Sequence, residues 1–220
     1  MRRLPWTRRI AAVASLGDEN RRKLFAFVAS SAQPVGRDDA AAALGIPRST
    51  ASFQLDRMVQ DGLLTVEFRK LGGRAGPGSG RPSKLYRTAQ PEVGASVPDR
   101  NYDLAGELMA AAIEQSTAAG QPVLDALLTT SHAKGREMAE GTANLQEFLS
   151  AEGYMPAPDG LGGYTLLNCP FHRLADGHTD VVCAMNGAFL SGVAAGCGVG
   201  EGRVARNDAP GECCARITPP

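Results

Sequence analysis

Proline and glycine residues end successive segments in the first part of this 220-residue chain, and their spacing restricts the possible fold more than any other sequence feature. Pro34 ends a segment whose apolar residues recur at helical spacing, and Gly45 stands where a tight turn needs a residue without a side-chain clash. Gly62 then ends the segment that follows the turn. The sequence therefore predicts three short helices, over about residues 19–31, 38–44 and 47–59.

A hairpin with a basic loop is expected after these helices. Residues 63–71 alternate apolar and polar side chains as a strand does, and residues 83–88 supply a returning strand. Between the two strands lies a loop rich in glycine, proline and arginine. Helix, helix, turn, helix and hairpin is the order of a winged helix-turn-helix domain, so we expect that domain at residues 1–88.

The formal net charge is zero, with 23 basic and 23 acidic residues, but the two signs are separated along the chain. Residues 1–90 contain 16 Lys and Arg against 7 Asp and Glu, which leaves 7 against 16 for the rest. A basic half joined to an acidic half is typical of a nucleic-acid-binding module attached to a different domain. Together with the order of the elements, this balance predicts binding to double-stranded DNA.

The third predicted helix has the side chains that a helix in the major groove needs. Short polar and amide side chains read base edges, and neighbouring cations hold the phosphates. The hairpin adds cations that can reach the DNA backbone or the minor groove. The predicted DNA-binding residues are Arg48, Ser49, Thr50, Ser52, Gln54 and Arg57 on the helix, and Arg74, Arg81 and Lys84 on the hairpin.

The segment Leu44–Leu64, which reads LGIPRSTASFQLDRMVQDGLL, resembles the recognition segment of ArsR-like winged-helix regulators. The segment Gly72–Tyr86 resembles the wing of the same family, so that the resemblance covers about residues 18–88. Such regulators are usually homodimers that read a palindromic DNA operator. The resemblance therefore implies a homodimeric transcription regulator.

The remainder of the chain is expected to form a second part. Residues 89–100 have the composition of a linker, and residues 101–220 follow as a dimerisation and sensor domain. Two long helices, over 102–118 and 122–143, carry small and apolar residues that could supply a dimer interface. The other expected elements are helices over 145–152 and 180–195, and strands over 164–168, 203–206 and 214–218. The predicted class is α+β: an N-terminal winged helix-turn-helix domain, a mainly helical dimerisation region and a small α/β sensor region that contains the cysteines.

The five cysteines all lie near the end of the chain: Cys169, Cys183, Cys197, Cys213 and Cys214. In a reducing cytosol, such clustering indicates metal ligation or redox chemistry before structural disulfides. The stretches Cys169-Pro-Phe-His, Cys183-Ala-Met-Asn and Pro210-Gly-Glu-Cys-Cys resemble the sensor end of the SufR-type iron–sulfur repressors, which control genes for iron–sulfur cluster assembly. The resemblance implies that Cys169, Cys183 and Cys213 are ligands, with Cys197 as a further candidate and Cys214 after it.

Helix geometry separates two of these cysteines. If one unbroken helix joined Cys183 to Cys197, the two would lie roughly 21 Å apart at 1.5 Å per residue, too far for one cluster. Either glycine ends that helix and the chain folds back, or Cys197 belongs to another site. Asn186 stands where many related chains carry histidine, which leaves thiolates as the main ligands. His172 and His178, near Cys169, are the two histidines kept as possible ligands.

The expected cofactor is an iron–sulfur cluster of 4Fe–4S or 2Fe–2S type. Compact zinc sites usually contain a C-x₂₋₄-C knuckle, which this chain lacks. Zinc, or a thiol switch without a cluster, is the alternative.

Three other classes are not expected. The chain has no Ser-His-Asp order, paired-carboxylate pattern or P-loop, so we do not expect an enzyme. No run of about eighteen apolar residues could span a membrane. The apolar stretch Ile10–Leu16 is too short for a signal peptide, so we expect a cytoplasmic protein.

Overall fold

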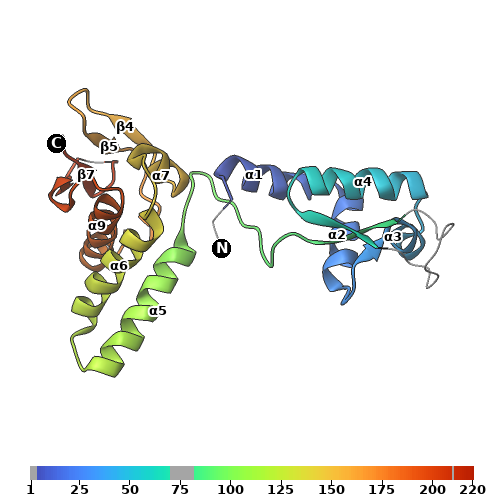
Figure 1. Ribbon diagram of the computed structural model, residues 1–220, viewed down its shortest axis with the longest axis horizontal. Coiled ribbons are helices and arrows are strands. Elements are labelled where there is room, and N and C mark those ends of the chain that lie inside the picture. Colours follow the sequence, from blue (N-terminus) through green and yellow to red (C-terminus); the bar gives the residue numbers. More distant parts are fainter. Residues whose placement is uncertain (1–3, 70–81, 210) are drawn as a thin grey trace. The chain divides into compact units, whose positions relative to one another are not determined.

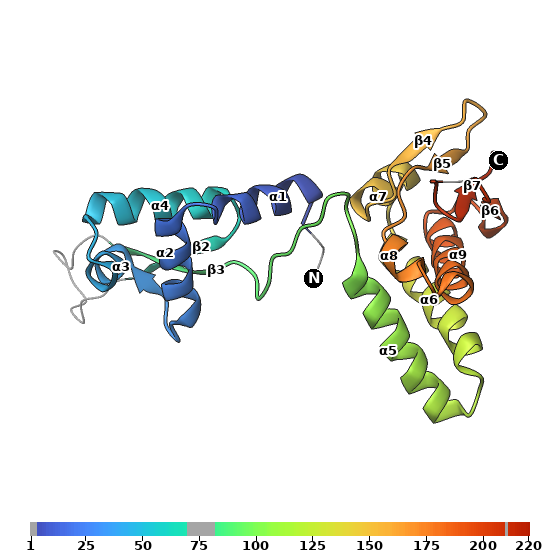
Figure 2. The same cartoon turned by 180° about the vertical axis from the view of Figure 1, so that it is seen from behind.

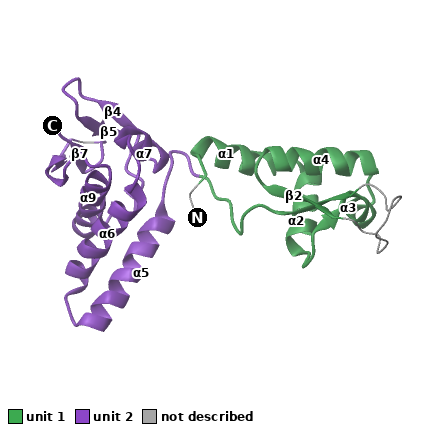
Figure 3. Ribbon diagram, viewed as in Figure 1, with its two compact units in different colours: residues 1–95 green, residues 96–220 purple. Residues whose placement is uncertain are grey.

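The computed structural model describes residues 4–69, 82–209 and 211–220, and the chain divides into two compact units (Figure 3). Unit 1 comprises residues 1–95 and unit 2 comprises residues 96–220. Each unit has its own core of buried apolar side chains. Both units combine helices with a small antiparallel sheet, which confirms the α+β class.

Unit 1 contains the helices α1 (Trp6–Ser15), α2 (Glu19–Ser30), α3 (Arg37–Leu44) and α4 (Arg48–Gln60), shown in Figure 1. Asp18 caps α2, because its carboxylate accepts a 2.9 Å hydrogen bond from the backbone of Arg21. Gly45 ends α3 with φ of 64°, a left-handed conformation that starts the turn into α4. Helices α2, α3 and α4 therefore lie within one residue of their predicted ends.

The sheet of unit 1 has the strands β1 (Val35–Gly36), β2 (Leu64–Arg69) and β3 (Ser83–Thr88), with β3 in the middle. The last two strands are the predicted hairpin, in which Leu64 pairs with Thr88 and Arg69 with Ser83. Leu55, Met58 and Tyr86 are fully buried where α4 packs against this sheet. This is the winged helix-turn-helix arrangement that the order of the elements predicts.

Helix α1 and strand β1 were not predicted. The buried face of α1 consists of Arg9, Ala12 and Ser15, so apolar periodicity could not reveal it. Strand β1 has only two residues, which is too short for any alternation to be visible.

Unit 2 contains the helices α5 (Tyr102–Ala119), α6 (Val123–Ala139), α7 (Leu145–Ala151), α8 (His172–Ala175) and α9 (Thr179–Gly196). Helices α6 and α9 run side by side over most of their length (Figures 1 and 2). The predicted helix over 122–143 is too long, because α6 stops at Ala139 and Gly141 already has φ of 77°. Helix α9 is unbroken, and Cys197 caps its C-terminal end.

The sheet of unit 2 is fully antiparallel, in the order β4 (Pro156–Pro158), β5 (Tyr164–Leu166), β7 (Ala215–Ile217) and β6 (Val204–Arg206). A short 3₁₀ helix, η1 (Glu201–Arg203), leads from α9 into β6. Strands β5, β6 and β7 fall within the predicted strand segments. Strand β4 and helix α8 were not predicted, because β4 begins and ends with proline, which does not indicate a strand, and α8 has only four residues. The core of the unit includes Leu149, Tyr154, Phe171 and Phe189, each fully buried.

Candidate functional site

The predicted DNA-binding residues differ in their solvent exposure. Arg48, Ser49 and Arg57 are exposed, Thr50, Ser52, Gln54 and Lys84 are half-buried, and Arg74 and Arg81 lie outside the described residues. Ser52 is hydrogen-bonded to Tyr86, so it is turned toward β3. The Oε1 atom of Gln54 is shielded from solvent and has no hydrogen-bond partner among the described residues. The freely exposed face of α4 is therefore narrower than the sequence suggests.

The three cations named on α4 and β3 are paired with carboxylates of the same unit. Arg48 pairs with Asp38, and the Nε atom of Arg57 lies 3.4 Å from a carboxylate oxygen of Asp61. The third pair, Lys84 with Asp56, joins β3 to α4. Ion pairs at a protein surface contribute only about 0–1 kcal/mol. A DNA phosphate can therefore replace the carboxylate partners of Arg48 and Arg57 at small cost, whereas Asp56 also has a structural role.

Asp56 fixes the rotation of α4 against the sheet. Its carboxylate accepts hydrogen bonds from Lys84 and, at 2.7 Å, from the hydroxyl of Tyr86. Partial burial raises the pKa of Asp56, but these two hydrogen bonds outweigh the burial and leave the pKa below its usual range. Burial and the bond to Asp56 together raise the pKa of Tyr86. These contacts hold the face of α4 that carries Asp56 against β3 and leave the opposite face exposed to solvent.

Four of the five cysteines come together in unit 2 and form a thiol cluster: Cys169, Cys183, Cys213 and Cys214. Their side chains are hydrogen-bonded in a row, Cys183 to Cys214, Cys214 to Cys213 and Cys213 to Cys169. Cys169 lies between β5 and α8, Cys183 in the first turns of α9, and the other two directly before β7. The fold therefore unites residues that are up to 45 positions apart in the sequence.

Cys197 lies outside this cluster. It follows the last residue of α9, whereas Cys183 lies near the start of the same unbroken helix. Over this length an α-helix rises by roughly 21 Å. The sequence left open whether glycine breaks this helix or Cys197 lies apart from the other cysteines. In the structure the helix is unbroken and Cys197 lies apart. Cys214, ranked last from the sequence, is within the cluster.

Hydrogen bonding and burial set the proton affinity of the four thiols. The bond donated by Cys213 lowers the pKa of Cys169, and the same bond raises the pKa of Cys213 to about 12. Burial raises the pKa of Cys183 to about 12, and the bond to Cys213 raises that of Cys214. Metal binding would have to displace these protons, so its affinity should increase with pH.

Asn186 contacts the thiol cluster in a way that the sequence analysis did not predict. It is 0% exposed, and its side-chain amide donates to the sulfur of Cys213 at 3.2 Å and to that of Cys214 at 3.7 Å. Its carbonyl oxygen accepts a 2.6 Å bond from the hydroxyl of Tyr154, which orients the amide toward the sulfurs. Hydrogen bonds of this kind stabilise negative charge on sulfur. The sequence analysis noted Asn186 only because many related chains carry histidine at this position, and it could not predict the hydrogen-bond partners of the amide.

Replacing Tyr154 with phenylalanine tests this orientation. The variant leaves the carbonyl of Asn186 unpaired in the core, so we expect the free energy of unfolding to fall by about 1–3 kcal/mol. Urea denaturation followed by circular dichroism gives the value. Tyr164→Phe, at a half-exposed tyrosine of β5, is the control and should change the free energy by less than about 0.5 kcal/mol. Equal effects of the two variants would show that the hydroxyl of Tyr154 has no orienting role.

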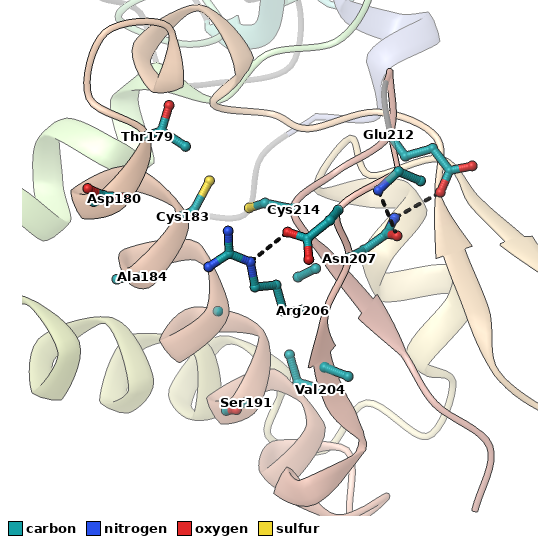
Figure 4. Close-up of a pocket in the computed structure, with 15 residues that line it drawn as sticks. Thr179, Asp180, Cys183, Ala184, Ser191, Val204, Arg206, Asn207, Glu212 and Cys214 are labelled. Atoms are coloured by element: carbon teal, nitrogen blue, oxygen red, sulfur yellow. Dashed lines mark hydrogen bonds and ion pairs between the residues drawn. The ribbon is translucent and has the colours of Figure 1, made fainter.

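The thiol cluster borders a pocket of about 530 Å³ between α9 and the β6–β7 segment. Cys183 and Cys214 lie on its wall with their sulfurs turned toward each other (Figure 4). Cys169 and Cys213 are buried behind them. Arg206 also lines the pocket, and its charge acts to lower the pKa of Cys183. The cluster is therefore closed on one side and open to solvent on the side of the pocket.

Among the described residues, no group of three or more His, Cys, Asp and Glu side chains has, as it stands, the geometry to hold a metal ion. His172 and His178 are both exposed, on or beside the short helix α8. Binding of a metal by this cluster would thus require the cysteine side chains to turn toward a common centre.

The segment that begins unit 2 is bound to the backbone beside Cys169. Arg100 donates through Nη1 to the carbonyl of Cys169 at 3.1 Å and to the side-chain carbonyl of Asn168. The backbone N–H of Asn101 donates to the carbonyl of Pro170, also at 3.1 Å. Residues on both sides of Cys169 are therefore held by the first few residues after unit 1.

Comparison with known proteins identifies the first unit. A family model described as a helix-turn-helix domain matches residues 16–67, from the end of α1 to β2. No curated protein and no solved structure matches the chain. Within the described parts of the chain, no helix is both long and apolar enough to cross a membrane. The chain thus contains a helix-turn-helix domain, which supports a DNA-binding transcription regulator.

Proposed function

We propose that this protein is a transcription repressor that binds operator DNA through α4 and responds to an iron–sulfur cluster held by the thiol cluster. The convergence of Cys169, Cys183, Cys213 and Cys214 is the observation that carries the proposal. The resemblance to SufR-type repressors supports iron–sulfur as the cofactor and cluster-assembly genes as the target. We propose a cytoplasmic location on the same grounds.

The donor set fits such a group. Iron–sulfur clusters are held by cysteine thiolates, and hydrogen bonds to the sulfurs tune their potentials. Asn186 supplies such bonds to Cys213 and Cys214, and Arg206 places a positive charge near Cys183. The bound cluster would supply a centre whose presence depends on iron, sulfide and oxidants. The pocket would give those small molecules access to its outer side.

Arg100 and Asn101 offer a route from the thiol cluster to the DNA-binding unit. Both residues follow unit 1 closely in the chain, and both are hydrogen-bonded to the backbone next to Cys169. If ligation of a cluster displaces the backbone at Cys169, the carbonyls of residues 169 and 170 move with it. The first residues of unit 2 would then shift, and with them the connection to the helix-turn-helix domain.

We further propose that the active form is a homodimer. The α5–α6 hairpin carries apolar side chains that are more than 40% exposed: Ile113, Val123 and Leu124. A second copy of this hairpin would cover them and would pair two copies of α4 for a palindromic operator. Light scattering on the full chain tests this proposal, and a monomeric mass would contradict it.

The central test compares cluster-loaded and cluster-free protein. Anaerobic purification should give a brown protein with matched iron and sulfide contents. Operator affinity, measured by fluorescence anisotropy, should then differ by about 5- to 150-fold between the two forms, the usual range of coupling between two sites. In Arg100→Ala we expect the cluster to be retained and this difference to shrink. Equal affinity of the loaded and cluster-free wild-type protein would contradict cluster sensing.

A zinc- or thiol-responsive regulator is the second candidate. The facing sulfurs of Cys183 and Cys214 at the pocket wall favour it, because they are accessible and adjacent. A colourless protein that contains zinc after anaerobic reconstitution would select the zinc form of this candidate. A metal-free protein whose DNA affinity changes on oxidation would select the thiol form.

A further inference from the structure

The exposed face of α4 has an aromatic side chain at its centre. Phe53 is 68% exposed, although it lies in a helix whose other large apolar side chains are partly or fully buried. It forms one row with Ser49, one turn before it, and with Arg57 and Gln60 after it, all of which are also exposed. The sequence analysis assigned only polar residues to this face.

The core of unit 1 does not use Phe53. The buried apolar cluster of this unit takes Ala51, Leu55 and Met58 from α4 and includes other phenylalanines at its margin. Asp56 and Ser52 hold α4 against β3 through Tyr86, so the helix cannot rotate Phe53 inward without breaking these bonds. Single exposed apolar side chains are common on protein surfaces, so it is the position of Phe53 on α4, the helix that a helix-turn-helix lays in the major groove, that indicates a contact with another molecule.

The neighbours of Phe53 indicate that this molecule is DNA. Ser49 and Arg57 lie one turn before and after it, and the guanidinium of Arg57 is exposed beside it. In the major groove the 5-methyl group of thymine is the apolar feature of a base pair, and a phenylalanine side chain can contact it. The other three bases carry no methyl group at that edge.

We propose that Phe53 is a specificity-determining residue that reads the 5-methyl group of a thymine in the operator. The inference rests on DNA binding through α4 and is independent of the cofactor. Burial of one methyl group contributes about fourfold in affinity, from roughly 0.8 kcal/mol per buried carbon. Loss of the methyl group from one thymine should therefore weaken binding of the wild-type protein by about that factor.

The test uses the full-length protein and a pool of random-sequence DNA duplexes. The sequence enriched by the wild-type protein is synthesised again with deoxyuridine, which lacks the methyl group, at each thymine in turn. Affinity is measured by fluorescence anisotropy for the wild-type protein and for Phe53→Ala. The substitution is at an exposed helix position, where alanine is well tolerated, and circular dichroism verifies the fold. Leu161→Ala, at a 76% exposed leucine of unit 2, is the control.

At one thymine position or its symmetry mate, we expect deoxyuridine to lower the DNA affinity of the wild-type protein by about fourfold. The Leu161→Ala control should show the same loss. In Phe53→Ala this penalty should disappear, and its own selection should no longer enrich thymine there. An identical deoxyuridine penalty in both proteins would overturn the role of Phe53 while leaving DNA binding intact. If the wild-type protein enriches no sequence at all, sequence-specific reading by α4 is itself contradicted.

Discussion

Gly192→Ala is expected to lower the free energy of unfolding of unit 2 by about 3 kcal/mol or more, the upper end of the usual cost of overpacking. A Cβ atom at Gly192 would lie 2.0 Å from the backbone carbonyl oxygen of His132, in the neighbouring helix α6. Contact with a backbone atom cannot be relieved by rotation of a side chain, so the two helices would have to separate. Urea denaturation of the full-length protein measures the change.

The same close approach occurs at two further glycines of the α6–α9 interface. A Cβ at Gly135 would lie 2.1 Å from the carbonyl oxygen of Phe189, and one at Gly196 would lie 2.6 Å from that of Arg136. Glycine is therefore required where the two backbones meet, in spite of its poor helix propensity. Separation of these helices would also move Cys183 and Asn186, which α9 carries.

Gly187→Ala is the matched control within α9. A Cβ there would meet no atom within 4 Å, so the variant should gain the better helix propensity of alanine, about 0.5–1 kcal/mol. The two variants make the same chemical change in the same helix and should shift stability in opposite directions. If Gly192→Ala were as stable as the wild type, α6 and α9 would not pack this closely in solution.

If the thiol cluster holds a metal centre as proposed, Cys213→Ser is expected to abolish its binding. Cys213 is 0% exposed and lies in the middle of the hydrogen-bonded row, next to both Cys169 and Cys214. Loss of a residue that hydrogen-bonds to a metal ligand lowers metal affinity by about 10- to 100-fold. Loss of a ligand itself should therefore lower the affinity by more than about 100-fold. Iron, sulfide and zinc per chain, with the visible absorption spectrum, measure the effect.

Cys197→Ser provides the control, since Cys197 lies at the other end of α9. It should retain the metal content and the spectrum of the wild-type protein. Because Cys213 is buried, Cys183→Ser at the half-exposed edge of the cluster supplies a second variant whose fold is less at risk. Full metal content in the folded Cys213→Ser and Cys183→Ser variants would contradict the assignment of the thiol cluster as the sensor.

Much of unit 1 could be predicted because its signals are local. Asp18 as an N-cap and Gly45 as a left-handed turn act on their immediate neighbours, so helix ends followed from sequence to within one residue. Elements without such signals were missed. Helix α1 buries arginine and serine, and strand β1 has two residues. Phe53 was missed for a related reason, because the pattern assigns aromatic residues to the interior by default.

For the candidate site, the sequence by itself determined which residue types are present and where they cluster along the chain. It placed all five cysteines in the last part of unit 2 and predicted a helix over 180–195, but it left open whether glycine breaks this helix before Cys197. Only the tertiary structure decided that this helix is unbroken, that Cys214 joins the cluster and that Asn186 donates to its sulfurs. These facts depend on how α9 packs against α6 and how β7 pairs with β5 and β6, contacts between residues far apart in the chain. Helical period and capping act over a few residues, whereas convergence of side chains depends on the packing of the whole unit.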